Sequence, residues 1–372
     1  MPMTEFTFNL ATSADDEAIQ RLLRENPVPG SISVSYERSP CYFHGCDVMG
    51  HSHQTLVARH LPSGEIAAVA GRSLRRMYIN GQVETVGYLG QLRVDRCYRS
   101  RWLVSGGFRF LGELHQDRQT RGYLTTIIEG NREAEGVLVS RARRHFPSYR
   151  PLERLHTLAL HVRLGAVPAM AGCEVRRGSE IDVDDIVAFL NRYGAGRQFF
   201  PVCTADDFTP DAHRTRGFLP DDFSLAIRNG RISGIIGLWD QSSFKQTVVH
   251  GYEGFLRWGR ILYDGYARLR GFRPLPGPGE PIPMCYAAFT CIADNDPGIF
   301  DLLLRQVLQS ASERGLSYLM IGHTERDPLL AIAGRRPHIP YCSRLYTVGW
   351  DTGSEFHDRL DSRISHVELA TL

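Results

Sequence analysis

The stretch from residue 92 to residue 114, LRVDRCYRSRWLVSGGFRFLGEL, constrains the fold of this chain more than any other. Leu92 and Val94 flank an arginine, an alternation that predicts the end of a half-buried strand. An arginine-rich loop follows, and from Leu103 the apolar residues recur at helical spacing. A helix that begins after a basic loop offers free N–H groups and a positive dipole end to phosphate. The stretch therefore predicts a strand–loop–helix unit with a phosphate or pyrophosphate site.

Length and charge limit the class of protein. The chain has 372 residues, 42% of them hydrophobic and 23% charged, which favours a globular protein of two domains. A net charge of +2 argues against nucleic acid as a partner. The sequence contains no apolar run of roughly 18 residues, so we expect no membrane span. It also has no basic-then-apolar signal region at its N-terminus, so a cytoplasmic location is expected. The oligomeric state stays open.

Eight cysteines are scattered along the chain without a C-x-x-C pair, which disfavours a disulfide framework. One segment, CYFHGCDVMGHSH, gathers residue types that bind zinc. Its spacing matches no common zinc finger and no second pair of ligands follows, so we predict no metal site. The segment is interpreted as a loop with incidental histidines, or as a border of the substrate pocket. The zinc-type residues are Cys41, His44, Cys46, His51 and His53.

Alternating patterns predict a mostly antiparallel sheet in the first half of the chain. Asn80-Gly81 is typical of a hairpin turn between two of its strands. On the strand after this turn, Glu84, Tyr88, Leu92 and Val94 are expected on one face, and Gly90 would tolerate a bulge. A helix is expected from about residue 130 to residue 144. The strands expected are residues 6–10, 54–60, 65–79, 82–94, 123–129 and 155–162.

The arginine-rich loop resembles motif A of the GNAT superfamily of acyl-CoA N-acyltransferases. From residue 94 to 104 the sequence V-D-R-C-Y-R-S-R-W-L-V follows the course of that motif, in which a strand-ending Val leads through Arg/Gln-x-x-Gly-x-Gly/Ala into a helix. Arg99 falls on the arginine of the motif. Ser100, Trp102 and Val104 stand where many members carry glycine or a small residue. Trp102 would either crowd the site or point away from it.

A second unit resembles motif B of the same superfamily, in which N-x-x-A begins a helix that borders CoA. Asn131 and Ala134 match it. The resemblance implies acyl-CoA, with acetyl-CoA expected, as cosubstrate, and the amine of a small molecule or peptide as acceptor. It also implies that the donor lies along the loop and both motifs. The donor-binding residues implied are Leu92, Arg93, Val94, Arg99, Ser100, Arg101, Trp102, Leu103, Val104 and Asn131.

The catalytic groups are less clear from the sequence. A tyrosine that often serves as general acid in motif B is replaced by Leu138. Tyr149 or Tyr88 could act as the acid in its place, although buried tyrosines are mostly core residues. Glu129 or Glu84 could act as the base, although each also reads as a structural carboxylate.

The second half of the chain repeats the pattern of the first. LVARHLPSGEIAAVAG at 56–71 and LAIRNGRISGIIG at 225–237 read alike, and they occur in the same order within each half. We therefore predict an α/β (α+β) protein of two tandem GNAT-like domains, 1–165 and 178–372, each a mostly antiparallel sheet flanked by helices. Asp294 and Asp296 occupy the second phosphate loop and would repel pyrophosphate, so only the first domain is expected to bind acyl-CoA.

The leading hypothesis is thus an acyl-CoA-dependent N-acyltransferase. A non-catalytic CoA-binding or ligand-sensing protein is the alternative, because the loop is poor in glycine and the usual tyrosine is missing. A structural protein in which Trp102 fills the site is a third hypothesis.

Overall fold

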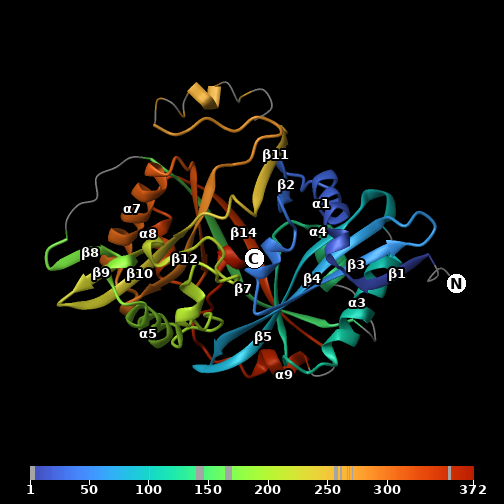
Figure 1. Cartoon of the computed structure of the whole chain (residues 1–372), viewed down its shortest axis with the longest axis horizontal. Helices are drawn as coiled ribbons and strands as arrows, with labels where there is room; N and C mark the ends of the chain where they lie inside the picture. Colours follow the sequence, from blue (N-terminus) through green and yellow to red (C-terminus); the bar gives the residue numbers. More distant parts are fainter. Residues whose placement is uncertain are drawn as a thin grey trace.

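The computed structural model describes residues 5–99, 101–139, 146–163, 170–254, 271–350 and 353–372, together with residues 259, 262–265, 267 and 269. These residues form a mixed α/β fold around a twelve-stranded, mostly antiparallel sheet, with helices on its faces (Figure 1). The predicted fold class is confirmed.

The elements are bounded as follows. The strands are β1 (Phe6–Leu10), β2 (Ile32–Glu37), β3 (Ser52–His60), β4 (Ile66–Ile79), β5 (Gln82–Val94), β6 (Tyr123–Ile128), β7 (Ser148–His161), β8 (Cys173–Arg177), β9 (Phe223–Arg228), β10 (Arg231–Trp239), β11 (Gln246–Tyr252), β12 (Met284–Ile292), β13 (Tyr318–Thr324) and β14 (His338–Gly349). The helices are α1 (Asp16–Glu25), α2 (His44–Asp47), α3 (Arg101–His115), α4 (Arg132–Ala134), α5 (Val183–Gly194), α7 (Pro297–Glu313), α8 (Leu329–Ala333) and α9 (Gly353–Asp358).

Strand order shows a repeated unit with an exchanged strand. The order in the large sheet is β1-β3-β4-β5-β6-β14-β7-β13-β12-β10-β9-β8. Read inward from either edge, the two halves have the same plan, and β3–β4 and β9–β10 occupy equivalent places, as the sequence repeat predicts. The sixth strand of each half comes from the other half of the chain, because β14 completes the first sheet and β7 the second. That the two repeated units are bounded at residues 1–165 and 178–372 stays a proposal.

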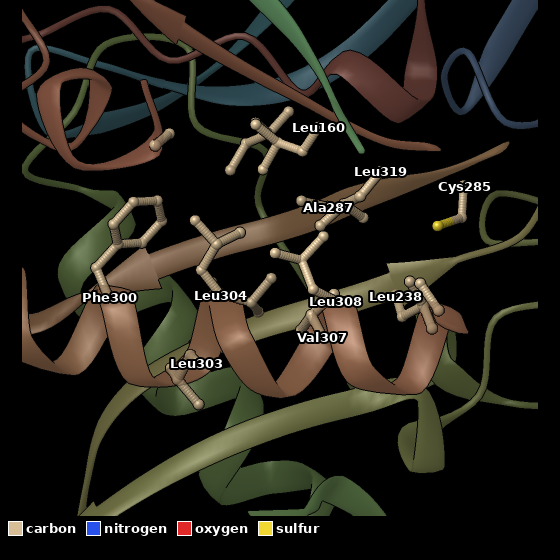
Figure 2. Packing of buried hydrophobic residues seen from close by; sticks show 14 of the residues in the cluster. Leu160, Leu238, Cys285, Ala287, Phe300, Leu303, Leu304, Val307, Leu308 and Leu319 are labelled. Carbon is tan, nitrogen blue, oxygen red and sulfur yellow. The ribbon is translucent and has the colours of Figure 1, made fainter. Parts of the chain in front are cut away.

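Each half-sheet is covered on both faces because its buried residues alternate. In the second half, Ile236 of β10 packs in the cluster under α7, whereas its neighbour Ile235 packs in the cluster under α5. Figure 2 shows α7 laying Leu304, Val307 and Leu308 towards the sheet. Each such side chain contributes about 1.5–3 kcal/mol when it is fully buried. In the first half, β3 divides its residues in the same way between α3 and α1.

A separate two-stranded sheet joins the halves. β2 pairs with β11 antiparallel, with Tyr36 opposite Thr247. The Gln246 side chain extends this contact, since its Oε1 accepts the N–H of Ser39 at 2.9 Å. The sequence analysis assigned residues 31–53 to loop with short helix or strand and 240–283 to an insertion. The sequence analysis therefore did not predict the pairing of β2 with β11, which lie roughly 200 residues apart.

Two predictions of local structure need correction. The helix expected to residue 144 is α4 followed by a π-helical turn to Val139, and residues 140–145 lie outside the described part of the chain. On β5, Leu92 and Val94 do not share a face with Tyr88. The ladder with β4 pairs Gly90 with Gly71 but Arg93 with Val69, so one extra residue reverses the alternation.

Candidate functional site

Strands β5 and β6 diverge at the centre of the first half. They run parallel, and the ladder between them holds two residue pairs, Gly87 with Tyr123 and Tyr88 with Leu124. Beyond them the Thr125 hydroxyl donates to the Leu89 carbonyl at 2.7 Å. Since β5 continues to Val94 without further pairing to β6, its main chain is available on that side to a ligand.

The extra residue of β5 lies where the strands separate. Gln91 adopts φ 60°, in the left-handed region, and the strand bulges around it. The Tyr42 hydroxyl donates to Gln91 Oε1 at 2.6 Å and so holds the side chain of the bulge. Leu92 and Arg93, which follow the bulge, line the cavity beside it. Sequence reasoning placed the bulge one residue away, at Gly90.

Helix α3 borders the same space. Leu103, Val104, Gly107 and Phe108 line it, and of these Leu103 and Gly107 belong to the helical face that the sequence spacing predicted. A Cβ built on Gly107 would meet no atom within 4 Å, whereas one on Gly106 would strike the ring of Phe8. The cavity therefore reaches the helix backbone at Gly107, where glycine leaves room for a ligand.

Together these elements border an open cavity of about 610 Å³. Its wall is mainly apolar and comes from both halves of the chain, including β2 and β11. Part of the wall is aromatic. Its tyrosines include Tyr36, whose ring centroid lies 5.8 Å from the guanidinium of Arg93 on β5, and Tyr252, Tyr286, Tyr318 and Tyr341.

The charges on the cavity wall are unequal. Among the described residues that line it, Arg38, Arg93 and Lys245 are basic and Glu37 has the one acidic side chain, while the last residue, Leu372, also lines it. Glu37 is already bound, since it accepts from Arg24 Nε at 3.3 Å and from the Ser35 hydroxyl. The cavity therefore suits apolar or anionic groups better than a polycation.

The structure brings six of the expected donor-binding residues to this cavity: Leu92, Arg93, Val94, Leu103, Val104 and Asn131. Asn131 also caps α4, because its side chain accepts from Ala134 N at 3.1 Å. Arg99 is half exposed and lies 3.3 Å from Glu133. Ser100 and the side chains of Arg101 and Trp102 lie outside the described part of the chain, so the orientation of Trp102 stays open.

Both candidate acids line the cavity. The Tyr88 hydroxyl lies 2.9 Å from Thr126 Oγ1. Tyr149 packs beside Phe108, with ring centroids 6.3 Å apart. Burial raises the pKa of both tyrosines, so their hydroxyls stay protonated at neutral pH and can donate a proton.

The two candidate bases lie elsewhere. Glu129 accepts two hydrogen bonds from Arg154, at 2.8 and 2.6 Å, and the hydrogen bonding to Arg154 lowers the pKa of Glu129. Glu84 is bound by Arg359. Neither carboxylate is among the described residues that line the cavity. That either carboxylate acts as the base stays a prediction, and their arginine partners and their places outside the cavity lining argue against it.

The segment of cysteines and histidines is engaged in other contacts. Cys41 Sγ lies 3.3 Å from Asp16, and His53 bonds to Ser73 and Thr55. Within the described residues, no group of three or more His, Cys, Asp or Glu side chains is placed to hold a metal ion. In the same part of the chain, no helix has the length and apolar character needed to cross a membrane.

The equivalent slot of the second half is filled. β12 bulges as β5 does, with Phe289 at φ 51°. Its N–H donates to Glu368 Oε2 at 2.8 Å, and the chain around Leu369 packs between β12 and β13. A space of about 10 Å³ is left there. The helix that follows is capped by its own Asp296, whose side chain accepts from Gly298 N at 2.8 Å. Sequence reasoning anticipated the acidic loop but not the filling segment.

Lys245 was also missed as a site residue. It is the sole lysine of the chain, and this rarity was the one signal in the sequence that could have singled it out. The sequence analysis had no means of placing it, because its position depends on β11 pairing with β2.

Solved structures share this architecture. A GCN5-related N-acetyltransferase from Sphaerobacter thermophilus matches with a TM-score of 0.57, at 15% identity over 99% of both chains. Saccharomyces cerevisiae N-myristoyltransferase, solved with myristoyl-CoA and inhibitors, matches with a TM-score of 0.61, at 11% identity over 92% of this chain and 80% of that one. A glucosamine N-acetyltransferase region of a fungal multi-domain β-N-acetylglucosaminidase matches with a TM-score of 0.59, at 13% identity over 92% of this chain and 38% of that one.

The protein thus has the fold of the GNAT superfamily, and the resemblance in the sequence is confirmed at the level of the fold. Its particular form is the tandem one, with two copies that share one sheet. No family model and no curated protein matches the sequence.

Proposed function

We propose that the protein is an N-acyltransferase that moves an acyl group from acyl-CoA to an amine. The observation that carries this proposal is the divergence of β5 and β6, which opens a cavity bounded by a bulged strand and by the first turns of α3. The thioester would lie along Leu92–Val94, whose N–H groups would polarise its carbonyl. A neutral amine would attack that carbonyl, and Tyr149 or Tyr88 would protonate the departing thiolate.

The cavity also supports proposals about both substrates. Its apolar wall and volume of about 610 Å³ suit an acyl chain longer than acetyl as well as acetyl itself. The aromatic wall and the already paired Glu37, its one acidic side chain among the described residues, favour an amine with an apolar or aromatic body. We propose arylalkylamines and aromatic amino acids as the first acceptors to test.

Donor binding can be tested at Gly107. Acetyl-CoA, octanoyl-CoA and free CoA are each expected to raise the melting temperature by a few degrees, since a ligand at 100 times its Kd stabilises by about 2.7 kcal/mol. A Cβ at Gly107 would meet no atom within 4 Å, so Gly107→Phe should place its ring in the cavity and lose the shift, and its melting temperature without ligand checks that it folds. Gly107→Ala is the matched control. It should keep the shift and gain roughly 0.5–1 kcal/mol in stability, because alanine favours a helix.

The outcomes separate the three hypotheses. A shift that Gly107→Phe abolishes, together with thiol release in the presence of an amine, supports the transferase. A shift without turnover in a broad amine panel supports a non-catalytic CoA-binding protein. The absence of any shift contradicts both and leaves the structural protein.

A further inference from the structure

Arg38 is a buried arginine whose hydrogen-bond partners are sulfur atoms. It follows β2 directly and is 7% exposed. Nη1 donates to Cys46 Sγ at 3.0 Å and Nη2 donates to Met49 Sδ at 3.5 Å. Sulfur is a weak acceptor, and a guanidinium has five N–H groups to donate. Among the described residues, no carboxylate, carbonyl or hydroxyl oxygen accepts from this side chain, so most of its capacity is left for a ligand.

The titratable side chains around Arg38 do not neutralise its charge. Burial raises the pKa of the Cys46 thiol, although the guanidinium beside it acts in the opposite sense. Burial, and then the positive charge of Arg38, lower the pKa of His53 to about 3. Both groups are therefore uncharged at neutral pH, and the guanidinium is a buried positive charge among neutral neighbours.

The nearby acidic groups are engaged with other bases. Glu37 is bound by the arginine of α1 described above, and Asp47 accepts from Arg216 at 2.9 Å. Lys245, another base of the cavity wall, donates to an oxygen of the last residue, Leu372, at 2.9 Å. A buried charge without an opposite charge is costly, so its presence on a cavity wall points to an anionic ligand.

The segment that contains α2 holds the guanidinium in place. A Cβ built on Gly45 would lie 2.8 Å from Arg38 Cδ, so the glycine lets the arginine pass close to the backbone of α2. The guanidinium also lies 4.9 Å from the centroid of the Tyr42 ring. These residues belong to the segment CYFHGCDVMGHSH, which the sequence analysis interpreted as a possible border of the substrate pocket. An arginine fixed in this way loses little entropy when it binds a ligand.

Arg38 borders the cavity close to the bulge of β5. Met49 Sδ accepts from Arg38 and also from the side chain of Gln91. Tyr42 joins the same two residues, since its ring lies beside the guanidinium and its hydroxyl donates to Gln91. Both Arg38 and Gln91 line the cavity. An anion bound by Arg38 would thus share this space with a thioester held along residues 92–94.

We propose that Arg38 binds a carboxylate of the substrate, which names a substrate class for the reaction proposed above and rests on it. A carboxylate matches the planar fork of a guanidinium. In an α-amino acid one carbon separates the carboxylate from the amine, so an anchored carboxylate would hold the amine near the bulge of β5. An aromatic amino acid would also use the tyrosines of the wall. The other source of a carboxylate is the far end of a dicarboxylic acyl group on the donor.

Calorimetry with two matched pairs of probes tests the proposal and separates the sources. Phenylalanine and 2-phenylethylamine differ by the carboxylate alone, and each is titrated into full-length protein with free CoA, so that no transfer occurs. We expect phenylalanine to bind about 10- to 100-fold more tightly, as a hydrogen bond to a charged group requires. Succinyl-CoA and butyryl-CoA differ by a carboxylate in place of a methyl group. A preference for succinyl-CoA would assign the carboxylate to the donor.

Three variants sharpen the result. Arg38→Met removes the guanidinium and keeps an unbranched apolar side chain, so the preference for the carboxylate probe should vanish. The same variant should melt at an equal or higher temperature, because an unpaired buried charge is removed. Arg38→Lys keeps the charge without the fork and should retain part of the preference. Arg21→Met, at an exposed arginine of α1, is the matched control and should change neither quantity.

The opposing outcomes are distinct. Equal affinities within both pairs, or a preference that survives in Arg38→Met, would overturn this inference. A clearly lower melting temperature of Arg38→Met would also overturn it, because the sulfur and aromatic contacts would then suffice as partners of the guanidinium. Donor binding that persists in any of these cases leaves the proposed function standing. An absence of both donor and carboxylate binding would overturn the two together.

Discussion

At the scale of the residue, two tyrosines are candidates for the general acid that protonates the departing thiolate. Where the GNAT motif usually has its tyrosine, this chain has Leu138, which lines the cavity as an apolar residue. Tyr88 and Tyr149 line the same cavity, and burial raises the pKa of each. Tyr88 is held by Thr126 at 2.9 Å, which favours Tyr149 as the proton donor.

Tyr149→Phe should therefore lower turnover about 100-fold, the usual contribution of a general acid. Affinity for the donor should stay unchanged, because a ring of the same shape remains beside Phe108. Thiol release measured with any amine that proves active gives the rate, and thermal shift gives the binding. Tyr88→Phe is the matched variant. A larger loss in Tyr88→Phe than in Tyr149→Phe would exchange the two roles.

An ion pair between a buried arginine and a partly exposed aspartate lies near the site. The Arg72 side chain is 1% exposed and binds both oxygens of Asp117, at 2.8 and 2.9 Å, while its Nε donates to the Tyr123 hydroxyl. Arg72→Ala should lower the free energy of unfolding by about 3 kcal/mol, because it removes a buried side chain together with its hydrogen bonds to Asp117 and Tyr123. Urea unfolding measures the change, and Arg21→Ala, at an exposed arginine of α1, is the control.

The same pair has a pH dependence with a defined sign. Although burial raises the pKa of Asp117, hydrogen bonds from Arg72 hold it below the usual value. The stabilisation is therefore present above the unfolded pKa of about 4 and is lost as the pH falls through the lower folded pKa. The difference in stability between the protein and Arg72→Ala should shrink below pH 4. A constant difference down to pH 2 would contradict this account.

At the scale of the residue, the local motifs indicated where the cavity lies. Leu92, Val94, Leu103 and Asn131, which the resemblance implied as donor-binding, all line it, and their role in binding stays a prediction. The sequence did not show that the candidate bases Glu129 and Glu84 are bound by arginines. The arginines that bind Glu129 and Glu84 are far away in the sequence, so no local pattern shows that these side chains are engaged.

Strands that pair with a neighbour in the sequence were predicted well, whereas strands that pair with a distant segment were not. The hairpin of β4 and β5 was placed from its Asn-Gly turn, and β5 has the predicted bounds. The register within it was not predictable, because the bulge at Gln91 depends on contacts such as the hydrogen bond from Tyr42. The pairing of β2 with β11 and the position of residues 365–371 are likewise set by tertiary contacts, since neither segment has a clear pattern.

The filled slot of the second half gives a prediction at the scale of the element. Glu368 Oε2 accepts the buried N–H of Phe289 at 2.8 Å. Glu368→Ala should destabilise by about 1–3 kcal/mol, the cost of a buried donor without a partner. Glu368→Gln retains an acceptor oxygen and should cost less. Urea unfolding compares the two. Equal losses would mean that charge, rather than the hydrogen bond, holds the segment.

Strand exchange determines the behaviour of the whole molecule. β14 lies between β6 and β7, and its residues Tyr346 and Val348 belong to the core of the first half. Residues 1–165 alone would lack that strand. We expect this fragment, and residues 170–372, to be unfolded or aggregated when produced separately and to co-purify one-to-one when produced together. Circular dichroism and size-exclusion chromatography test this. A separately folded fragment 1–165 would show that the first half is self-sufficient.

The exchanged strand also bears on how the protein is made. A ribosome adds residues from the N-terminus at roughly 5–20 per second, and most domains can fold as they emerge. Here the first half-sheet has to wait for His338–Gly349, so its β6 edge stays unpaired until nearly the whole chain has been synthesised. An unpaired edge over an apolar core is open to aggregation during that interval. Yield in cells should therefore depend on chaperones and on the speed of translation more than the stability of the finished fold would suggest.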